Sequence, residues 1–282
     1  MKKARVIILA GQSNAVGVGW VKYLPRSYSS EEIKQFSDGY EKILINYTSH
    51  DIKSDGFVKT RINCCERTKD TLGPEVGIAK KLTEKYPDEE FFIVKCAVGG
   101  VSLAGDWLSP SSGAPYDEKR SAILPESISD PKVRFLGWCY NEMIKRLSLA
   151  LAQLKESGYE PEIIAFCWMQ GESDSGNAEA NEAYIGRYDA LLGDLRAAFP
   201  SAFSPDCRYI DAAISERWNN YEKMNANKKK YAETHKNHFF IDTVAEGLTT
   251  LNEPEENPDT AHYDCASTVK LGELFAEKIV LI

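Results

Sequence analysis

The chain has 282 residues, of which 43% are hydrophobic and 27% charged, a composition typical of a globular protein that can bury a large core. Its formal net charge of -8 excludes a general affinity for nucleic acid or anionic membranes unless a local basic patch is present. The basic run at 228–230 falls in a predicted helix, flanked by Glu222 and Glu233, so we interpret it as a solvated helix face.

The N-terminus combines a charged start with an apolar run, as signal peptides do. The run at 6–10 is shorter than an export signal and no small-residue cleavage pattern follows it, so we interpret it as the first buried strand. No stretch approaches the roughly 18 apolar residues of a membrane span. We therefore expect a cytoplasmic protein without nucleic-acid or membrane partners, secreted only if a signal peptide precedes this numbering.

Short apolar runs typical of buried strands alternate with amphipathic helical patterns along the chain. The strand-like runs are 6–10, 43–47, 91–98, 163–168, 208–214 and, more weakly, 239–244. The predicted helices are 75–85, 133–157, 181–199, 218–235 and 267–280. Continuous apolar strands indicate a sheet covered on both faces, and strand–helix alternation indicates a parallel sheet. We predict one α/β domain over residues 1–282.

Two segments, 49–72 and 102–132, carry no regular pattern, and long irregular loops in a compact domain are commonly lids or binding loops. The seven cysteines are odd in number and include no CxxC pair. This argues against a disulfide framework or a zinc site and predicts buried free thiols in a reducing compartment.

Ligands of open parallel sheets bind beyond the carboxyl ends of the strands, so polar residues after each apolar run are candidates for chemistry. The first run ends in Gly-Gln-Ser-Asn at 11–14. Gly11 permits a tight turn, and Ser13 would stand near a helix N-terminus, where its own N–H can stabilise negative charge. Ser13 is a candidate nucleophile, with a plain helix N-cap as the alternative.

Two later apolar runs are also followed by candidate site residues. Gly99 and Gly100 follow the third run, and their N–H groups could approach a ligand or simply form a turn. After the fourth run, Gln170 could donate its amide N–H to an oxyanion. Glu172 and Asp174 could orient a neighbour or cap the next helix.

A serine nucleophile needs a base, and the base needs an orienting carboxylate. Among the four histidines, His262 has an acid, Asp259, three residues earlier in a loop before the last predicted helix. This short spacing lets the carboxylate reach Nδ1 while Nε2 faces the serine. Asp259 and His262 are therefore the candidate partners of Ser13.

Five motifs occur in order along the chain: Gly-Gln-Ser-Asn at 11–14, Gly-Pro-Glu at 73–75, Ala-Val-Gly-Gly at 97–100, Trp-Met-Gln-Gly-Glu-Ser-Asp at 168–174 and Asp-Thr-Ala-His at 259–262. This set resembles the sialate O-acetylesterase and acetylxylan esterase group of the SGNH (GDSL-like) hydrolase superfamily. The resemblance extends over nearly the whole chain. It implies a flavodoxin-like three-layer α/β/α sandwich around about five parallel strands.

The resemblance also implies roles for individual residues. Ser13 would be the nucleophile, His262 the base and Asp259 its partner. The oxyanion hole would combine the Ser13 N–H, an N–H of Gly99 or Gly100, and the Gln170 side chain, with Gln12, Asn14 and Glu172 in support. The substrate would be a small-molecule or oligosaccharide acetyl ester, and no metal or organic cofactor would be needed. The Gly-Pro-Glu motif would be structural, forming a turn and the first helical turn.

The sequence departs from the superfamily in lacking a G-x-N-D block, and Gln170 would stand in for its asparagine. Trp107, in the second irregular segment, lies where a sugar could stack. Three alternatives remain. A lipase or thioesterase would need an apolar channel, a non-catalytic carbohydrate-binding relative would have lost part of the triad, and a flavodoxin-like nucleotide-binding protein would need a glycine-rich phosphate loop.

Overall fold

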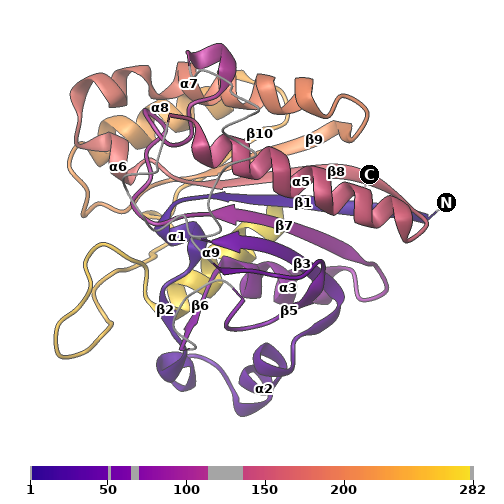
Figure 1. Cartoon of the computed structure of the whole chain (residues 1–282). Coiled ribbons are helices and arrows are strands. Elements are labelled where there is room, and N and C mark those ends of the chain that lie inside the picture. The colour runs from indigo at the N-terminus through magenta and orange to yellow at the C-terminus, as the bar shows by residue number, and fades with distance from the viewer. Residues whose placement is uncertain (1, 50–51, 65–69, 114–135, 280–282) are drawn as a thin grey trace.

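A computed structural model describes residues 2–49, 52–64, 70–113 and 136–279. Its centre is a sheet with the strand order β10-β9-β8-β1-β7-β3-β4, and the strands from β10 to β3 run parallel (Figure 1). Each parallel strand overlaps one of the predicted apolar runs, and the start of the weaker sixth run, residues 239–241, lies in the edge strand β10. Their bounds are β1 (Lys2–Gly11), β3 (Tyr40–Ser49), β7 (Phe91–Ala97), β8 (Tyr159–Met169), β9 (Phe203–Ala212) and β10 (His238–Ile241).

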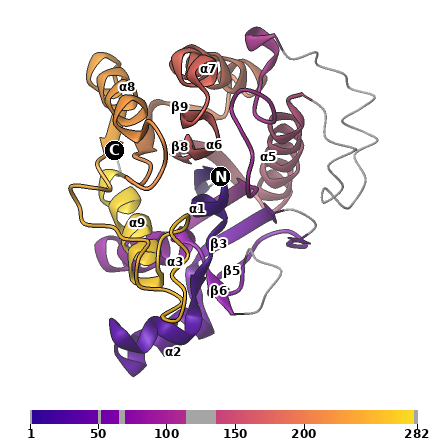
Figure 2. The same ribbon diagram turned by 90° about the vertical axis from the view of Figure 1, so that its left-hand side faces the viewer.

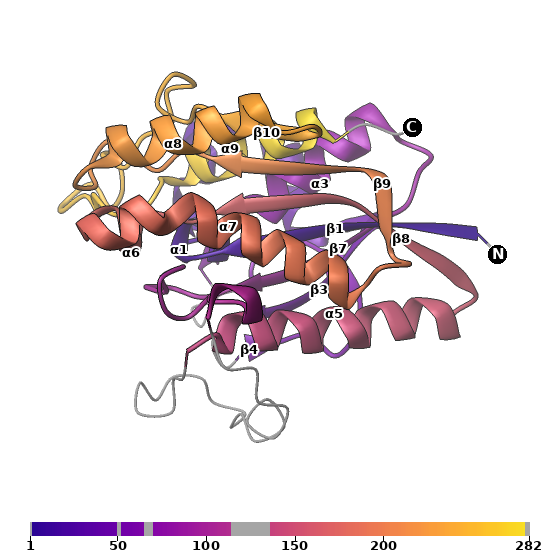
Figure 3. The ribbon, with the colours of Figure 1, turned by 90° about the horizontal axis from the view of Figure 1, so that it is seen from above.

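Helices cover both faces of this sheet. On one face α3 (Pro74–Lys85) packs against α9 (Cys265–Lys278), and on the other α5 (Trp138–Glu156) lies beside α7 (Ala178–Ala198). Figures 2 and 3 show the two layers on opposite sides of the strands. The remaining long helix, α8 (Tyr221–Thr234), packs against β10 and α7. The predicted three-layer α/β/α sandwich is thus confirmed, with more parallel strands than the five expected.

Several boundaries differ from the sequence prediction for local reasons. Of the helix predicted at 133–157, residues 133–135 lie outside the described residues, and α5 begins at Trp138 after Gly137, which takes a left-handed conformation with φ 78. The segment 49–72 is not wholly irregular, since it contains the short strands β4 (Ile52–Lys53), β5 (Val58–Thr60) and β6 (Thr71–Leu72). Strands β4 and β5 pair antiparallel with β3, and β6 pairs with β2 (Gly19–Trp20).

Some short helices were not predicted. The clearest is α2 (Ser30–Asp38), which begins with a capping box between Ser29 and Glu32 that the sequence does display. The others are α6 (Glu172–Ser175) and the 3-10 turns η1 (Val21–Arg26) and η2 (Pro110–Ser112). The short helix α1 (Ser13–Val16) begins at Ser13, where a helix N-terminus was expected. The part of the irregular segment 102–132 beyond residue 113 lies outside the described residues.

The core is one continuous hydrophobic cluster among the described residues, and it includes side chains from both layers and from the sheet. The described cysteines are buried free thiols, as predicted: Cys64, Cys96, Cys139, Cys167, Cys207 and Cys265. Cys65 lies outside the described residues. In the part of the chain that the structure describes, no helix is both long and apolar enough to cross a bilayer.

The interpretation of 228–230 as a solvated helix face is wrong for Lys228. Its side chain is fully buried, while Lys229 and Lys230 are exposed. The Lys228 ammonium donates to the Gln170 carbonyl (2.7 Å) and pairs with Asp211 (2.9 Å). This lysine therefore joins α8 to the ends of β8 and β9.

Candidate active site

Ser13 begins α1 at the carboxyl end of the central strand β1, where Figure 2 shows α1 and α6 close to the middle of the molecule. The turn before it depends on Gly11, which has φ +144 and whose added Cβ would lie 1.9 Å from the Met169 carbonyl oxygen. The Gln12 N–H donates to the same carbonyl (2.9 Å). A side chain at position 11 would therefore push the turn at 11–14 away from β8. This turn is called the nucleophile turn below, after the candidate nucleophile Ser13.

Asp259 and His262 form a hydrogen-bonded pair, with 2.6 Å between Asp259 Oδ2 and His262 Nδ1. Burial by itself raises the pKa of Asp259. The hydrogen bonds from His262 and from the Ala261 N–H outweigh this effect and lower that pKa below its ordinary value. The carboxylate is therefore ionised at neutral pH and accepts a hydrogen bond from the Nδ1–H of His262. In the neutral ring this leaves Nε2 without a hydrogen, as a base requires.

Asn14 joins the nucleophile turn to the histidine loop, the segment 259–265 that contains Asp259 and His262. Its Oδ1 accepts the Tyr263 N–H (3.0 Å), across 249 positions of sequence, and its Nδ2 donates to Glu172 Oε1 (2.8 Å). The neighbours of Ser13 and His262 are thus directly bonded to each other. The structure brings all three predicted triad residues to one end of the sheet, although no hydrogen bond joins Ser13 to His262 among the described residues.

Glu172 lies beneath this junction and is fully buried. Burial raises the pKa of its carboxyl, while the hydrogen bond from Asn14 and the nearby Lys228 and His262 favour the ionised form. Its Oε2 has no hydrogen-bond partner among the described residues. The predicted supporting residues Gln12, Asn14 and Glu172 therefore do lie together under Ser13, and the glutamate fixes the Asn14 amide.

Gln170 does not have the geometry of an oxyanion donor. Its Nε2 lies 2.6 Å from Asp174 Oδ2, and it also lies 3.3 Å from both Gln12 Oε1 and the Val101 carbonyl. An amide nitrogen carries two hydrogens, and these acceptors account for both. The structure therefore does not support the predicted role for this side chain. Gln170 instead ties the end of β8 to the turns that surround Ser13.

Gly99 and Gly100 lie beside the nucleophile turn, since the preceding Val98 N–H donates to the Gly11 carbonyl (3.3 Å). Gly100 takes a left-handed conformation with φ +70, and an added Cβ there would meet nothing within 4 Å. Further along, the buried Asp174 carboxylate accepts the Leu103 and Ala104 N–H groups, each at 2.8 Å. The glycine pair is therefore held near Ser13 from both sides, and its role in an oxyanion hole stays a prediction.

Trp107 is not a platform for a sugar, and this prediction is wrong. Its side chain is 0% exposed and its ring packs edge-to-face on Trp168, with 5.1 Å between the ring centroids. A ring without exposed surface cannot stack on a substrate. Its place in a polar, irregular sequence gave no sign that this segment folds back onto the core.

Sequence reasoning missed a buried ion pair under α1. The Lys95 ammonium, on β7, donates to the Val16 carbonyl (2.7 Å) and to Glu75 Oε2 (2.6 Å). Both charged side chains are 0% exposed. Glu75 belongs to the Gly-Pro-Glu motif, which forms a helix start as predicted, but its carboxylate also anchors the end of the nucleophile helix. A lysine within an otherwise apolar strand was the sign that could have revealed this pair.

The described residues hold no group of three or more His, Cys, Asp or Glu side chains placed to bind a metal ion. The groups that the structure gathers at this edge of the sheet are a serine, an imidazole with its carboxylate, and backbone N–H groups. This combination is suited to acyl transfer.

The model of one protein family, described as "Carbohydrate esterase, sialic acid-specific acetylesterase", matches residues 3–281. This chain belongs to that family. It is therefore a carbohydrate O-acetylesterase, a carboxylic ester hydrolase, as the ordered motifs predicted. A search of curated proteins finds no significant match.

Solved structures similar to this family member share its fold at low identity. NanS is 18% identical with a TM-score of 0.67, covering 99% of this chain and 97% of its own. A protein from Arabidopsis thaliana is 20% identical with a TM-score of 0.65, covering 98% and 97%. A carbohydrate acetylesterase from Xanthomonas citri is 14% identical with a TM-score of 0.61, covering 97% of this chain and 55% of its own.

Proposed function

We propose that the chain removes O-acetyl groups from carbohydrates through a Ser13–His262–Asp259 triad and an acetyl-enzyme intermediate. The observation that carries this proposal is the 2.6 Å bond between Asp259 and His262, in a loop bonded to the residue after Ser13. Membership of a carbohydrate acetylesterase family supports the choice of an acetyl ester as substrate. The substrate is an acetylated sugar, either free or part of an oligosaccharide.

In the first half-reaction, His262 Nε2 accepts the Ser13 proton while Oγ attacks the acetyl carbonyl. The ionised Asp259 holds the Nδ1 proton and stabilises the imidazolium that forms. The tetrahedral intermediate collapses, and the sugar oxygen leaves with the proton from His262. Water then attacks the acetyl-enzyme with His262 again as the base, releasing acetate and restoring Ser13.

The oxyanion formed in each half-reaction needs preorganised donors. The Ser13 N–H, in the first turn of α1, and an N–H from the Gly99–Gly100 pair are the groups we assign to this role. Removing one such donor costs about 3 kcal/mol in the transition state, or roughly 100-fold in rate. Two backbone donors cannot be deleted by ordinary mutation, so the triad offers the more direct test.

The test is turnover of p-nitrophenyl acetate, butyrate and octanoate by the wild type and by Ser13→Ala. We expect turnover of the acetate, a steep fall with acyl-chain length, and loss of activity by at least about 1,000-fold in Ser13→Ala. Ser173→Ala is the matched control, because Ser173 is an exposed serine in α6 whose side chain forms no hydrogen bond among the described residues. This control should retain wild-type activity.

Each outcome separates the candidate functions. Turnover that rises with chain length would contradict an acetylesterase and favour a lipase or thioesterase. An equal, low background in wild type and Ser13→Ala would overturn the triad assignment. If the acetate is turned over as expected, a panel of acetylated sialic acids and xylo-oligosaccharides then ranks the sugars by kcat/KM.

A further inference from the structure

Glu253 lies at the base of the loop that carries Asp259 and His262, and it contacts both ends of that loop. Its backbone carbonyl accepts the Asp259 N–H (2.8 Å). Its side-chain Oε2 accepts the Cys265 N–H, also at 2.8 Å. The segment between these two bonds, residues 259–265, contains both the base and its orienting acid.

We propose that Glu253 is a positioning residue that closes this catalytic loop and fixes His262 relative to Ser13. The two bonds of Glu253, to the Asp259 N–H and the Cys265 N–H, are called the Glu253 clamp below. The inference rests on the proposed triad, since it assigns Glu253 an effect on His262. Cys265 begins α9, which is packed against α3, so the carboxylate ties the loop to a rigid element. Without that bond, the Tyr263 N–H would still donate to Asn14 and the Asp264 N–H to the Thr249 carbonyl (3.0 Å). The segment would lose the one side-chain bond that links the base of the loop at Glu253 to the first residue of α9.

Nearby carboxylates do not duplicate this bond. Asp264 already accepts the Ser267 N–H (2.8 Å) at the start of α9 and the Asn252 amide (2.7 Å). Glu255 points to Arg26, with which it forms an ion pair. Glu253 is thus the carboxylate that the structure places on the Cys265 N–H, and the residue is only 7% exposed.

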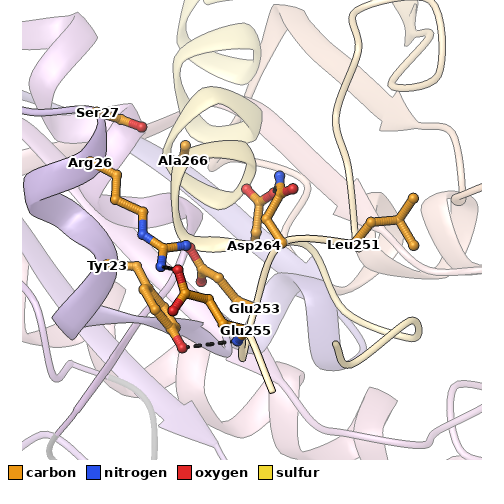
Figure 4. Close-up of a pocket in the computed structure, with 9 residues that line it drawn as sticks. Tyr23, Arg26, Ser27, Leu251, Glu253, Glu255, Asp264 and Ala266 are labelled. Carbon is orange, nitrogen blue, oxygen red and sulfur yellow. Dashed lines mark hydrogen bonds and ion pairs between the residues drawn. The ribbon is translucent and has the colours of Figure 1, made fainter. Parts of the chain in front are cut away.

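Glu253 also borders a cavity of about 480 Å³ between η1 and the loop segments before and after His262 (Figure 4). Arg26 and Tyr23 face this cavity from η1, Asp264 faces it from the start of α9, and Glu255 lies on the loop itself. The Arg26 guanidinium stacks over the Tyr23 ring at 4.2 Å. The cavity gives the buried carboxyl a route to solvent and protons.

The charge state of Glu253 changes within the working range of most enzymes. Burial raises its pKa to about 7 and Asp264 adds to this rise, while the Cys265 and Trp20 N–H groups and Arg26 oppose it. An ionised acceptor forms a stronger hydrogen bond than a neutral one, so the bond to Cys265 tightens as pH rises through 7. Global stability changes in the opposite sense. A raised carboxyl pKa stabilises the fold at low pH, and this contribution is lost as pH rises towards 7.

The first test measures local order without using activity. Amide hydrogen exchange across residues 259–265 is compared in wild type, Glu253→Ala, Glu253→Gln and the control Glu255→Ala. We expect Cys265 exchange to accelerate at least 10-fold in Glu253→Ala, and to stay within about 3-fold of wild type in Glu253→Gln, which retains an oxygen acceptor. Unchanged exchange in Glu253→Ala would overturn the proposal even if the enzyme proved inactive.

The second test is kinetic, with Ser13→Ala in the same assay. For Glu253→Ala we expect kcat to fall at least 10-fold with KM within about 3-fold, because a misplaced base slows chemistry more than binding. Glu255→Ala should match wild type. Equal turnover by the wild type and Ser13→Ala would refute the triad. In that case the hydrogen-exchange result alone would decide whether Glu253 holds the loop in place. Wild-type kcat in a folded Glu253→Ala would refute the clamp alone.

If Glu253→Ala fails to fold, the pH profile of Glu253→Gln decides the question. The quantity compared is kcat of the wild type divided by kcat of Glu253→Gln, a ratio in which effects of pH common to both enzymes cancel. We expect a ratio near 1 at pH 6, where Glu253 is largely neutral, and a rise of several-fold by pH 8. A ratio that does not change with pH would indicate a merely structural residue and would overturn the proposal.

Discussion

Asn14 lies in the nucleophile turn and forms a hydrogen bond to Tyr263 in the histidine loop. Replacing it with alanine would remove both hydrogen bonds and leave the Tyr263 N–H and the Glu172 carboxylate unpaired. Each unpaired buried group costs about 1–3 kcal/mol. We expect Asn14→Ala to lower kcat by at least 10-fold and to lower Tm, as measured with p-nitrophenyl acetate and by thermal melting.

Asn177→Ala is the matched control for this change. Asn177 caps α7 by accepting the Ala180 N–H (2.9 Å), and loss of a cap costs about 1 kcal/mol. The two variants should therefore both lose stability, but only Asn14→Ala should lose activity. Equal activity in both would show that the bond between the two loops does not position the triad.

Among the elements, α8 is fastened to the sheet by Lys228. The neighbouring Asp211 is buried, and this burial raises its pKa to about 6, although Lys228 opposes the rise. Lys228→Met would leave that carboxylate without its counter-ion, at a cost of about 3–5 kcal/mol in the free energy of unfolding. The exposed neighbour Lys229→Met should change stability by less than about 0.5 kcal/mol.

The pH dependence of this loss follows from the sign of the Asp211 shift. A carboxyl whose folded pKa is raised stabilises the fold at low pH, and that contribution is lost as pH rises through the folded pKa. Removing Lys228 raises the Asp211 pKa further and enlarges the loss. The stability difference between wild type and Lys228→Met should therefore grow from pH 5 to pH 8 in urea titrations. A difference that shrinks over this range would contradict the buried ion pair.

Helices α3 and α9 approach each other at glycines. An added Cβ on Gly77 would lie 1.9 Å from the Val269 carbonyl oxygen, and one on Gly272 would lie 1.9 Å from that of Pro74. Gly77→Ala must therefore push the helices apart, and we expect it to destabilise by more than about 2 kcal/mol. Because α9 follows directly after His262, activity should also fall.

Gly186→Ala serves as the control, since Gly186 lies within α7 and an added Cβ would meet nothing within 4 Å. Alanine should stabilise that helix by about 0.5–1 kcal/mol. Thermal melting of both variants tests the pair. Similar Tm values would show that α3 and α9 can separate without penalty.

The sequence predicts the strands of the sheet better than it predicts the contacts of buried polar side chains. Apolar runs identify the parallel strands because a strand buried on both faces must be apolar throughout, whatever its neighbours. The contacts of Lys95 and Lys228, and those of Gln170 with Gln12 and Val101, could not be read in this way, since the partners lie on other elements and no local pattern joins them. The prediction that Trp107 stacks on a sugar failed for the same reason, because its burial depends on contact with Trp168. The pairing of Asp259 with His262 was predictable since the two residues are local to each other, and the ordered motifs supplied Ser13 as their candidate partner.

At the scale of the whole molecule, the site unites residue 13 with residues 259 and 262, so it requires both ends of the chain to be folded. The core is one cluster among the described residues, and β1 lies centrally within the sheet between β7 and β8. The C-terminal helix α9 covers α3 on the sheet, so its release would expose core surface. We therefore expect one cooperative unit rather than separate domains.

Urea titration followed by three probes tests this expectation. Far-UV circular dichroism reports the helices, fluorescence reports the buried Trp107, Trp138 and Trp168, and p-nitrophenyl acetate turnover reports the triad. The three curves should superimpose, because losing the α9 layer, the core or the site each requires loss of the others. Activity that disappears at a lower urea concentration than the other signals would show that the loop bearing Asp259 and His262 opens separately. In that case its anchors at Asn14 and Glu253 would be weaker than the core that supports them.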